Sequence, residues 1–252
     1  MKSSDDFYVG WQSRAPARIA STVRRTLLLL VPGITILALA FAYAQQTIGT
    51  SVFEWGKVKE FAGVWKNSPY PYLLVPRAGS ESFSAYYLVR PFKFGIDRQL
   101  AEELDGKAVR LKGTLIYRGS QTMIEVADKS IRESDPGQIP HPSAPAPVSL
   151  GEQTLVGEIV DSKCYLGVMN PGRLAPHRAC AIRCISGGIP PLFLVRQKDG
   201  SALHLLLVAS DGRPVNKEVL DLVALPVEIT GEVFRQGELL VLRADPAAYR
   251  RL

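Results

Sequence analysis

An internal repeat limits the fold of this chain more than any other feature of its sequence. Residues 71–77 have the sequence PYLLVPR, and residues 191–197 have the sequence PLFLVRQ. Matching blocks at one period are much harder to obtain by chance than a single strand pattern. The sequence therefore predicts two copies of one fold. Five further positions match at one constant offset: Val109, Leu111, Gly113, Leu115 and Gly119 correspond to Val227, Ile229, Gly231, Val233 and Gly237.

Each copy has the pattern of a small β-barrel. Short apolar segments rich in β-branched residues predict three strands, a helical segment and two more strands. The helical segments are Asp97 to Leu104 and Asn216 to Val223, with Asp97 and Asn216 as expected N-caps. Five strands with a helix between the third and fourth follow the order of an OB-like barrel. The predicted fold is mainly β, with two tandem OB-like five-stranded barrels.

An uncharged segment precedes the two copies. Residues 26–44, TLLLLVPGITILALAFAYA, form a run of 19 residues, about the length that crosses a bilayer. Arg24 and Arg25 lie just before it, so the positive-inside rule predicts a cytoplasmic N-terminus. The 25-residue lead and the apolar run are long for a removable signal peptide, so an uncleaved signal anchor is predicted. The end of the run also fits a cleavage site, and a signal peptide removed after Ala44 is the alternative.

These features divide the chain into segments with different roles. Downstream of the membrane, five prolines favour an extended, semi-rigid spacer between the two copies. The predicted segments are a cytoplasmic basic and aromatic tail (1–25), a transmembrane helix (26–44), the first OB-like domain (52–133), a proline-rich linker (134–149) and the second OB-like domain (150–252) with an inserted Cys/His helix-loop (164–190).

The insertion is the main difference between the two copies. It contains all three cysteines of the chain and one of its three histidines. Gly63 and Pro71 lie eight residues apart in the first copy, whereas Gly157 and Pro191 lie 34 residues apart in the second. The barrel does not require this segment, because the first copy lacks it. It falls between strands one and two, where OB-like folds commonly place ligand-contacting loops.

Four side chains of the insertion form a candidate metal site. If Pro176 to Ile185 is helical, His177, Cys180 and Cys184 lie on one face, and Cys164 can fold back over them. Thiolate and imidazole ligands suit Zn²⁺ or Cu(I), so a zinc or copper ion is the predicted cofactor of a Cys₃His site. Met169 can offer a thioether to copper, although plain packing is its simpler interpretation.

Two other interpretations use the same residues. Exported segments with several cysteines most often form a disulfide, and Cys164 can pair with Cys180 or Cys184. The third interpretation is a thiol enzyme with Cys180 or Cys184 as nucleophile and His177 as base. No orienting acid or oxyanion motif is evident, so an enzyme is the least favoured of the three.

Charge gives weaker information about partners. The net charge of +6 and the pI near 9.3 can signal nucleic-acid binding. The basic residues are scattered, without a basic stripe interleaved with aromatics, so nucleic acid is not an expected partner. The expected partners are the membrane and a membrane or periplasmic protein. Asp161 and Lys163 are expected to be exposed, and Lys163 to lower the thiol pKa of Cys164.

The run GEIVDSKCYLG…HRACAIRCISGGIPP resembles a group of small exported bacterial domains with the pattern GEVVD-x-x-CYL…H-x-x-CA-x-x-CI-x-GG-x-P. The similarity covers residues 155–242, roughly the second copy, and the group is largely uncharacterised. It implies an exported OB-like domain and no particular activity. The expected location is the bacterial inner (cytoplasmic) membrane, with a single span and both barrels in the periplasm.

The combined hypothesis is a membrane-anchored accessory or binding protein with a Cys₃His metal site. This hypothesis extends to a role as a subunit of a membrane redox complex. The alternative is a disulfide-stabilised OB-like interaction module without a metal ion.

Overall fold

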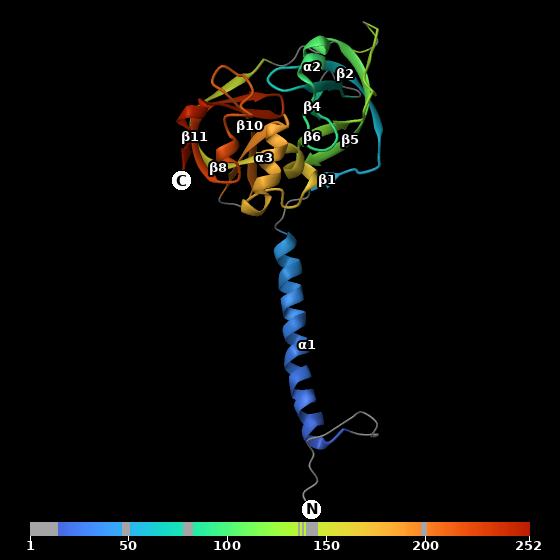
Figure 1. Ribbon diagram of the computed structural model, residues 1–252, viewed down its shortest axis with the longest axis vertical. Helices are drawn as coiled ribbons and strands as arrows, with labels where there is room; N and C mark the ends of the chain where they lie inside the picture. The colour runs from blue at the N-terminus through green and yellow to red at the C-terminus, as the bar shows by residue number, and fades with distance from the viewer. Residues whose placement is uncertain are drawn as a thin grey trace, which may run out of the picture. The chain divides into compact units, whose positions relative to one another are not determined.

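The computed structural model describes residues 15–46, 51–77, 83–135, 137, 139, 146–197 and 201–252 (Figure 1). The chain forms two compact units, Met1–Gly49 and Thr50–Leu252. The first unit contains one long helix. The second contains both barrels and the insertion.

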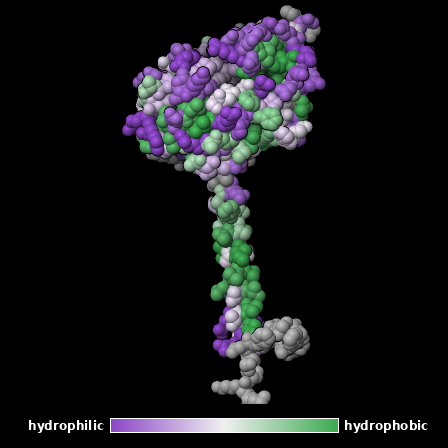
Figure 2. Space-filling model, in the orientation of Figure 1, coloured by the Kyte–Doolittle hydropathy of each residue, from purple (hydrophilic) through white to green (hydrophobic). Residues whose placement is uncertain are grey.

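Helix α1 (Ala17–Gln46) includes the whole predicted span 26–44 and extends beyond both of its ends. At the N-terminal side, the hydroxyl groups of Ser21 and Thr22 donate hydrogen bonds to the carbonyl oxygen of Arg18. The helix is long and apolar enough to cross a membrane, a test that a signal sequence also passes. Its surface is mostly hydrophobic in Figure 2. Residues 1–14 of the expected tail lie outside the described residues.

The first barrel is a closed OB-like sheet. Strand β2 pairs with β5 on one side and with β3 on the other. Strand β4 pairs in parallel with β6, and β6 pairs with β5, which closes the barrel. Asp97 caps α2 as predicted, because its carboxylate accepts the Leu100 N–H at 3.2 Å. The elements are β1 (Ser51–Phe53), β2 (Lys59–Lys66), β3 (Tyr72–Pro76), β4 (Phe83–Val89), α2 (Arg98–Leu104), β5 (Ala108–Arg118), β6 (Gln121–Val126) and β7 (Arg132–Glu133).

The second barrel repeats this topology. Strand β8 pairs with β9 and β11, and β10 pairs in parallel with β12, which closes the barrel on β11. Both barrels are therefore closed and five-stranded, as the repeat predicts. The strands are β8 (Val148–Asp161), β9 (Pro191–Arg196), β10 (Ala202–Val208), β11 (Pro226–Gln236), β12 (Leu239–Arg243) and β13 (Arg250–Arg251), with short 3₁₀ turns η3 (Leu220–Leu222) and η4 (Pro246–Ala248).

The helix predicted at 216–223 is wrong in form. Only the 3₁₀ turn η3 occurs there, and Asn216 does not cap it. The Asn216 side-chain amide instead donates to the carbonyl oxygens of Ile185 and Ile189 in the insertion, at 2.8 and 2.9 Å. The apolar residues of this segment pack against the insertion in one buried cluster, so tertiary contacts replace the regular helix.

The register of the strands confirms the repeat at single-residue level. Gly63 of β2 pairs with Val109 of β5, and Gly157 of β8 pairs with Val227 of β11. A Cβ atom on Gly63 would overlap the carbonyl oxygen of Leu74 on the neighbouring strand. A Cβ atom on Gly157 would overlap the carbonyl oxygen of Leu194, the matching residue of the second barrel. Each barrel therefore needs a glycine at the equivalent position of its first barrel strand, where the neighbouring strand leaves no room for a side chain.

The two barrels share an apolar core. One buried cluster contains Tyr72, Tyr87 and Ile116 of the first barrel together with Val160 and Leu192 of the second. Half of the expected linker 134–149 lies outside the described residues, and its last two residues belong to β8. The shared core means that side chains from one barrel can complete a site in the other.

We expect Gly63→Ala and Gly157→Ala each to lower the free energy of unfolding by about 2 kcal/mol, because the added methyl group must displace a paired strand. Urea unfolding of the full-length protein in mild detergent measures this change. Glu60→Ala on the same strand as Gly63 is the control, since its exposed ion pair with Arg110 contributes at most about 1 kcal/mol. Unchanged stability in both glycine variants would contradict the equivalence of the two positions.

Candidate metal centre

The insertion folds into three short helical elements between β8 and β9. They are a π-helical turn η1 (Cys164–Val168), a 3₁₀ turn η2 (Ala175–His177) and helix α3 (Arg178–Ser186). The predicted helix at 176–185 is therefore present, with its start tightened into η2. Gly188 follows with φ of 96°, a left-handed conformation that glycine adopts without strain and that ends the helix.

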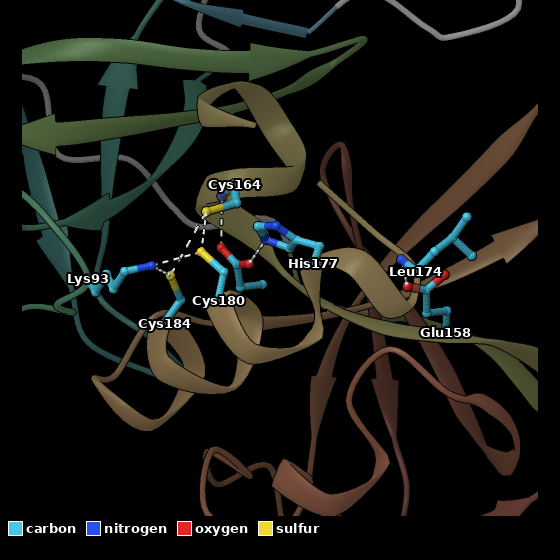
Figure 3. A network of polar contacts seen from close by, with 8 residues as sticks. Lys93, Glu158, Cys164, Leu174, His177, Cys180 and Cys184 are labelled. Carbon is cyan, nitrogen blue, oxygen red and sulfur yellow. Dashed lines mark hydrogen bonds and ion pairs between the residues drawn. The ribbon is translucent and has the colours of Figure 1, made fainter. Parts of the chain in front are cut away.

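Three thiols converge between η1 and α3 (Figure 3). The Cys164 Sγ lies 4.0 Å from the Cys180 Sγ and 3.9 Å from the Cys184 Sγ, and the three sulfur atoms lie within 4.8 Å of one another. All three cysteines are free, and these separations are far longer than the roughly 2.05 Å of a disulfide. Cys164 and Cys184 are buried, and Cys180 is partly exposed.

His177 lies beside this thiol group and is held by an acid. Its Nε2 is 3.0 Å from Oδ2 of Asp161, and Oδ1 of Asp161 accepts the backbone N–H of Cys164 at 2.8 Å. Asp161, Cys164 and His177 form a second group with ligand atoms within 4.8 Å of one another. Cys164 belongs both to this group and to the group of three thiols. The structure thus places all four predicted ligands in one region, with His177 next to Cys164.

The expectation that Asp161 and Lys163 are exposed is wrong. Asp161 is 0% exposed and Lys163 is 2% exposed. Strand β8 ends at Asp161, and Lys163 immediately precedes η1, so both side chains lie where the strand passes into the helical elements of the insertion. The Lys163 Nζ donates to the carbonyl oxygens of Arg90 and Phe92 at 2.9 and 2.6 Å and pairs with Oε2 of Glu125 at 2.5 Å. Lys163 therefore joins the insertion to the first barrel.

The predicted effect of Lys163 on the Cys164 thiol is also wrong. The pKa of Cys164 is raised, first because of its hydrogen bond with Cys184 and then because of burial. The pKa of Cys184 is lowered, first by the hydrogen bond from Cys164 and further by the positive charge of Lys93. The thiolate of this cluster is therefore favoured at Cys184 and disfavoured at Cys164.

Lys93 is a residue of the site that the sequence did not reveal. It follows strand β4 of the first barrel, and its Nζ lies 2.7 Å from the Cys180 Sγ and 3.8 Å from the Cys184 Sγ. Its hydrogen bond to Cys180 raises the pKa of Lys93, so the ammonium form is stabilised. No spacing signal connects Lys93 to the cysteines, because the contact arises only when the two barrels pack together.

Backbone contacts fix Lys93 against the insertion. The Gly95 N–H donates to the carbonyl oxygen of Gly187 at 2.9 Å. A Cβ atom on Gly187 would overlap the carbonyl oxygen of Lys93, and one on Gly167 would overlap that of Val52. The glycines of the insertion therefore allow the two backbones to approach closely enough for an ammonium group of one barrel to reach the thiols of the other.

A pocket of about 410 Å³ gives access to the thiols. Beyond the three cysteines, Lys93 and Lys163, it is lined by Phe92, Phe94, Val168, Met169 and Arg183. Phe92 is 83% exposed and has a φ of 62°, which is uncommon for an aromatic residue. The opening is therefore apolar and aromatic, with basic groups and without carboxylates among its lining residues.

His204 lies apart from the predicted ligands. Its Nε2 is 3.2 Å from the hydroxyl oxygen of Tyr165, the residue after Cys164. Burial, with a smaller contribution from the charge of Arg118, lowers the pKa of His204 to about 4. The imidazole is thus a partly buried side chain that contacts Tyr165 and takes no part in the thiol cluster.

Comparisons with known proteins support no assignment. No protein-family model matches the chain, and no curated protein matches it. The wild-type single-stranded DNA binding protein from Thermus aquaticus matches with 13% identity and a TM-score of 0.22, and 81% of this chain and 88% of that chain are covered. A deletion mutant of that protein gives a TM-score of 0.24 with the same identity and coverage. These scores are too low to support any statement about this chain.

We expect Lys163→Met to destabilise the protein by about 3 kcal/mol, because it leaves the Glu125 carboxylate, which is only 14% exposed, without its partner. The matched control is Lys107→Met, which removes an exposed pair with Glu133 and costs at most about 1 kcal/mol. Urea unfolding of the full-length protein in mild detergent measures both values. Equal effects of the two substitutions would contradict a buried inter-barrel ion pair.

The His204 pKa predicts a pH dependence of stability. Between pH 6.5 and about 4 the unfolded chain binds a proton at this residue and the folded chain does not, so stability falls as the pH falls through this window. The loss amounts to about 3 kcal/mol when complete. The difference between unfolding curves of wild type and His204→Gln, measured from pH 7.5 to 4, isolates this contribution. Parallel curves for the two proteins would show that His204 has an ordinary pKa.

Proposed function

We propose that this chain is a membrane-anchored, extracytoplasmic binding protein that holds one soft transition-metal ion in the insertion of its second barrel. The observation that supports this most is the convergence of three free thiols, 3.9 and 4.0 Å apart, on one accessible pocket. Helix α1 serves as an uncleaved anchor, with the N-terminus in the cytoplasm and the barrels in the periplasm. Arg24 and Arg25 at the start of its apolar run support this orientation.

The spacing of the sulfur atoms fits direct coordination. Zinc–thiolate bonds of about 2.3 Å at tetrahedral angles place neighbouring sulfur atoms about 3.8 Å apart. Cys164, Cys180 and Cys184 need little movement to reach that spacing. Cu(I) is equally compatible with such a thiolate-rich site. The three cysteines are the proposed primary ligands.

His177 is the proposed fourth ligand. Metal-bound histidines usually donate the second ring N–H to a carboxylate, which fixes the ring and its tautomer. Asp161 provides such a carboxylate at Nε2, and this leaves Nδ1 of His177 as the free ring nitrogen. Asp161 also accepts the backbone N–H of Cys164 and so holds two proposed ligands at once.

Lys93 is proposed to balance the charge of the loaded site. Three thiolates and one Zn²⁺ carry a net charge of −1, and three thiolates with Cu(I) carry −2. A partly buried anionic centre is costly unless a cation compensates it. The Lys93 ammonium lies against Cys180, and Arg183 lines the same pocket. The first barrel thereby contributes to a site whose ligands all come from the second.

The partner remains a membrane or periplasmic protein, and a membrane redox complex is the proposed setting. Soft ligands, an anchor and an extracytoplasmic location support this setting. That nucleic acid is not a partner stays a prediction of the scattered charge.

A disulfide-stabilised interaction module is the second candidate. The observation that favours it is the contact between Cys164 and Cys184, because a thiolate at Cys184 next to a thiol is a suitable pair for oxidation. A thiol enzyme has less support. His177 does have an orienting acid in Asp161, but the thiol that it accompanies is that of the buried Cys164, whose pKa is raised.

Metal analysis of the full-length protein tests the first candidate. We expect one zinc or copper ion per chain after purification from its native compartment. Cys164→Ser, Cys180→Ser and Cys184→Ser should each abolish stoichiometric binding, and Asp161→Asn should weaken it by about 10- to 100-fold. Ser186→Ala, an exposed position at the end of α3, is the matched control.

Mass spectrometry of the same sample separates the two candidates. A Cys164–Cys184 or Cys164–Cys180 disulfide without bound metal would contradict the metal site and support the interaction module.

A further inference from the structure

Met169 is an exposed thioether beside the thiols. Met123 is completely buried, whereas Met169 is 45% exposed. The plain packing expected from the sequence therefore accounts for Met123 but not for Met169. An exposed, flexible and oxidisable side chain at this place calls for another reason.

The position of Met169 is fixed relative to Cys164. It directly follows η1, and its backbone N–H donates to the carbonyl oxygen of Cys164 at 2.9 Å. Gly172 has a φ of 64°, and a Cβ atom there would lie 2.8 Å from the carbonyl oxygen of Met169 and 2.9 Å from that of Cys164. The chain thus returns over both residues and holds their backbones together. Met169 lines the same pocket as all three cysteines.

The pocket discriminates between types of ion. A neutral thioether is a ligand for soft Cu(I), whereas Zn²⁺ in proteins is bound by thiolate, imidazole and carboxylate. No carboxylate or imidazole is among the residues that line this pocket in the described structure. Lys93 and Arg183 are positively charged, and they repel a divalent cation more strongly than a monovalent one. Each of these features favours Cu(I) at the opening.

We propose that Met169 is a transfer ligand for Cu(I), which it binds at the mouth of the pocket and passes to Cys164, Cys180 and Cys184. The inference rests on the proposed metal-binding function and makes copper the ion of the site. Copper remains Cu(I) throughout. The bond from copper to the thioether sulfur breaks as bonds to the cysteine sulfurs form, and the protons of the thiols pass to solvent.

The test measures the rate of Cu(I) uptake by the reduced full-length protein in detergent under anaerobic conditions. A chromophoric Cu(I) chelator supplies the ion, and its loss of colour reports transfer. Met169→Leu keeps an apolar side chain of similar size and lacks the thioether. We expect this variant to take up Cu(I) about tenfold more slowly, as for loss of a supporting ligand, while the final amount bound stays at one ion per chain. Met123→Leu controls for replacing a methionine elsewhere in the core.

The outcomes separate the transfer ligand from the metal site itself. Equal uptake rates in wild type and Met169→Leu would overturn the role of Met169 and leave the thiol site intact. Binding of Zn²⁺ without uptake of Cu(I) by the wild type would also overturn it. Failure of the wild type to bind either ion would overturn the proposed function together with this inference.

Discussion

The buried ion pair between Lys163 and Glu125 is the interaction on which the arrangement of the site depends. Lys163 immediately precedes the insertion of the second barrel, and Glu125 belongs to β6 of the first barrel. The ammonium group also satisfies two carbonyl oxygens of the loop that carries Lys93. A buried pair of this kind is weak evidence for added stability, but it penalises any packing in which one partner stays buried alone. It therefore links the chain just before the thiols to the first barrel.

The insertion serves as both the joint between the barrels and the support of the thiols. Its glycines allow close backbone contact with the first barrel, and its helix α3 presents Cys180 and Cys184 to the pocket. Because the same short segment performs both tasks, the sulfur atoms are held by the shared core and not by a free loop. Such support from a rigid core is what a preformed metal site requires.

Sequence reasoning recovered what depends on local pattern and on the repeat. The barrels follow from strand periodicity and the matched positions at Gly63 and Gly157, and the helix of the insertion follows from its spacing. It missed what depends on packing between the copies. Lys93 is distant in sequence from the cysteines, and Asp161 and Lys163 have the residue types of exposed positions although both are buried. Charges in a shared core are recognisable only once their partners are placed.

Three cysteine sulfurs and the imidazole of His177 are proposed to bind one soft metal ion. X-ray absorption spectroscopy at the metal edge, on the full-length protein loaded with one equivalent of Cu(I) or Zn²⁺, tests it most directly. We expect a coordination shell dominated by sulfur at about 2.3 Å, which is lost when Cys164, Cys180 and Cys184 are replaced by serine. A coordination shell of only oxygen and nitrogen, unchanged in the triple variant, would contradict this proposal.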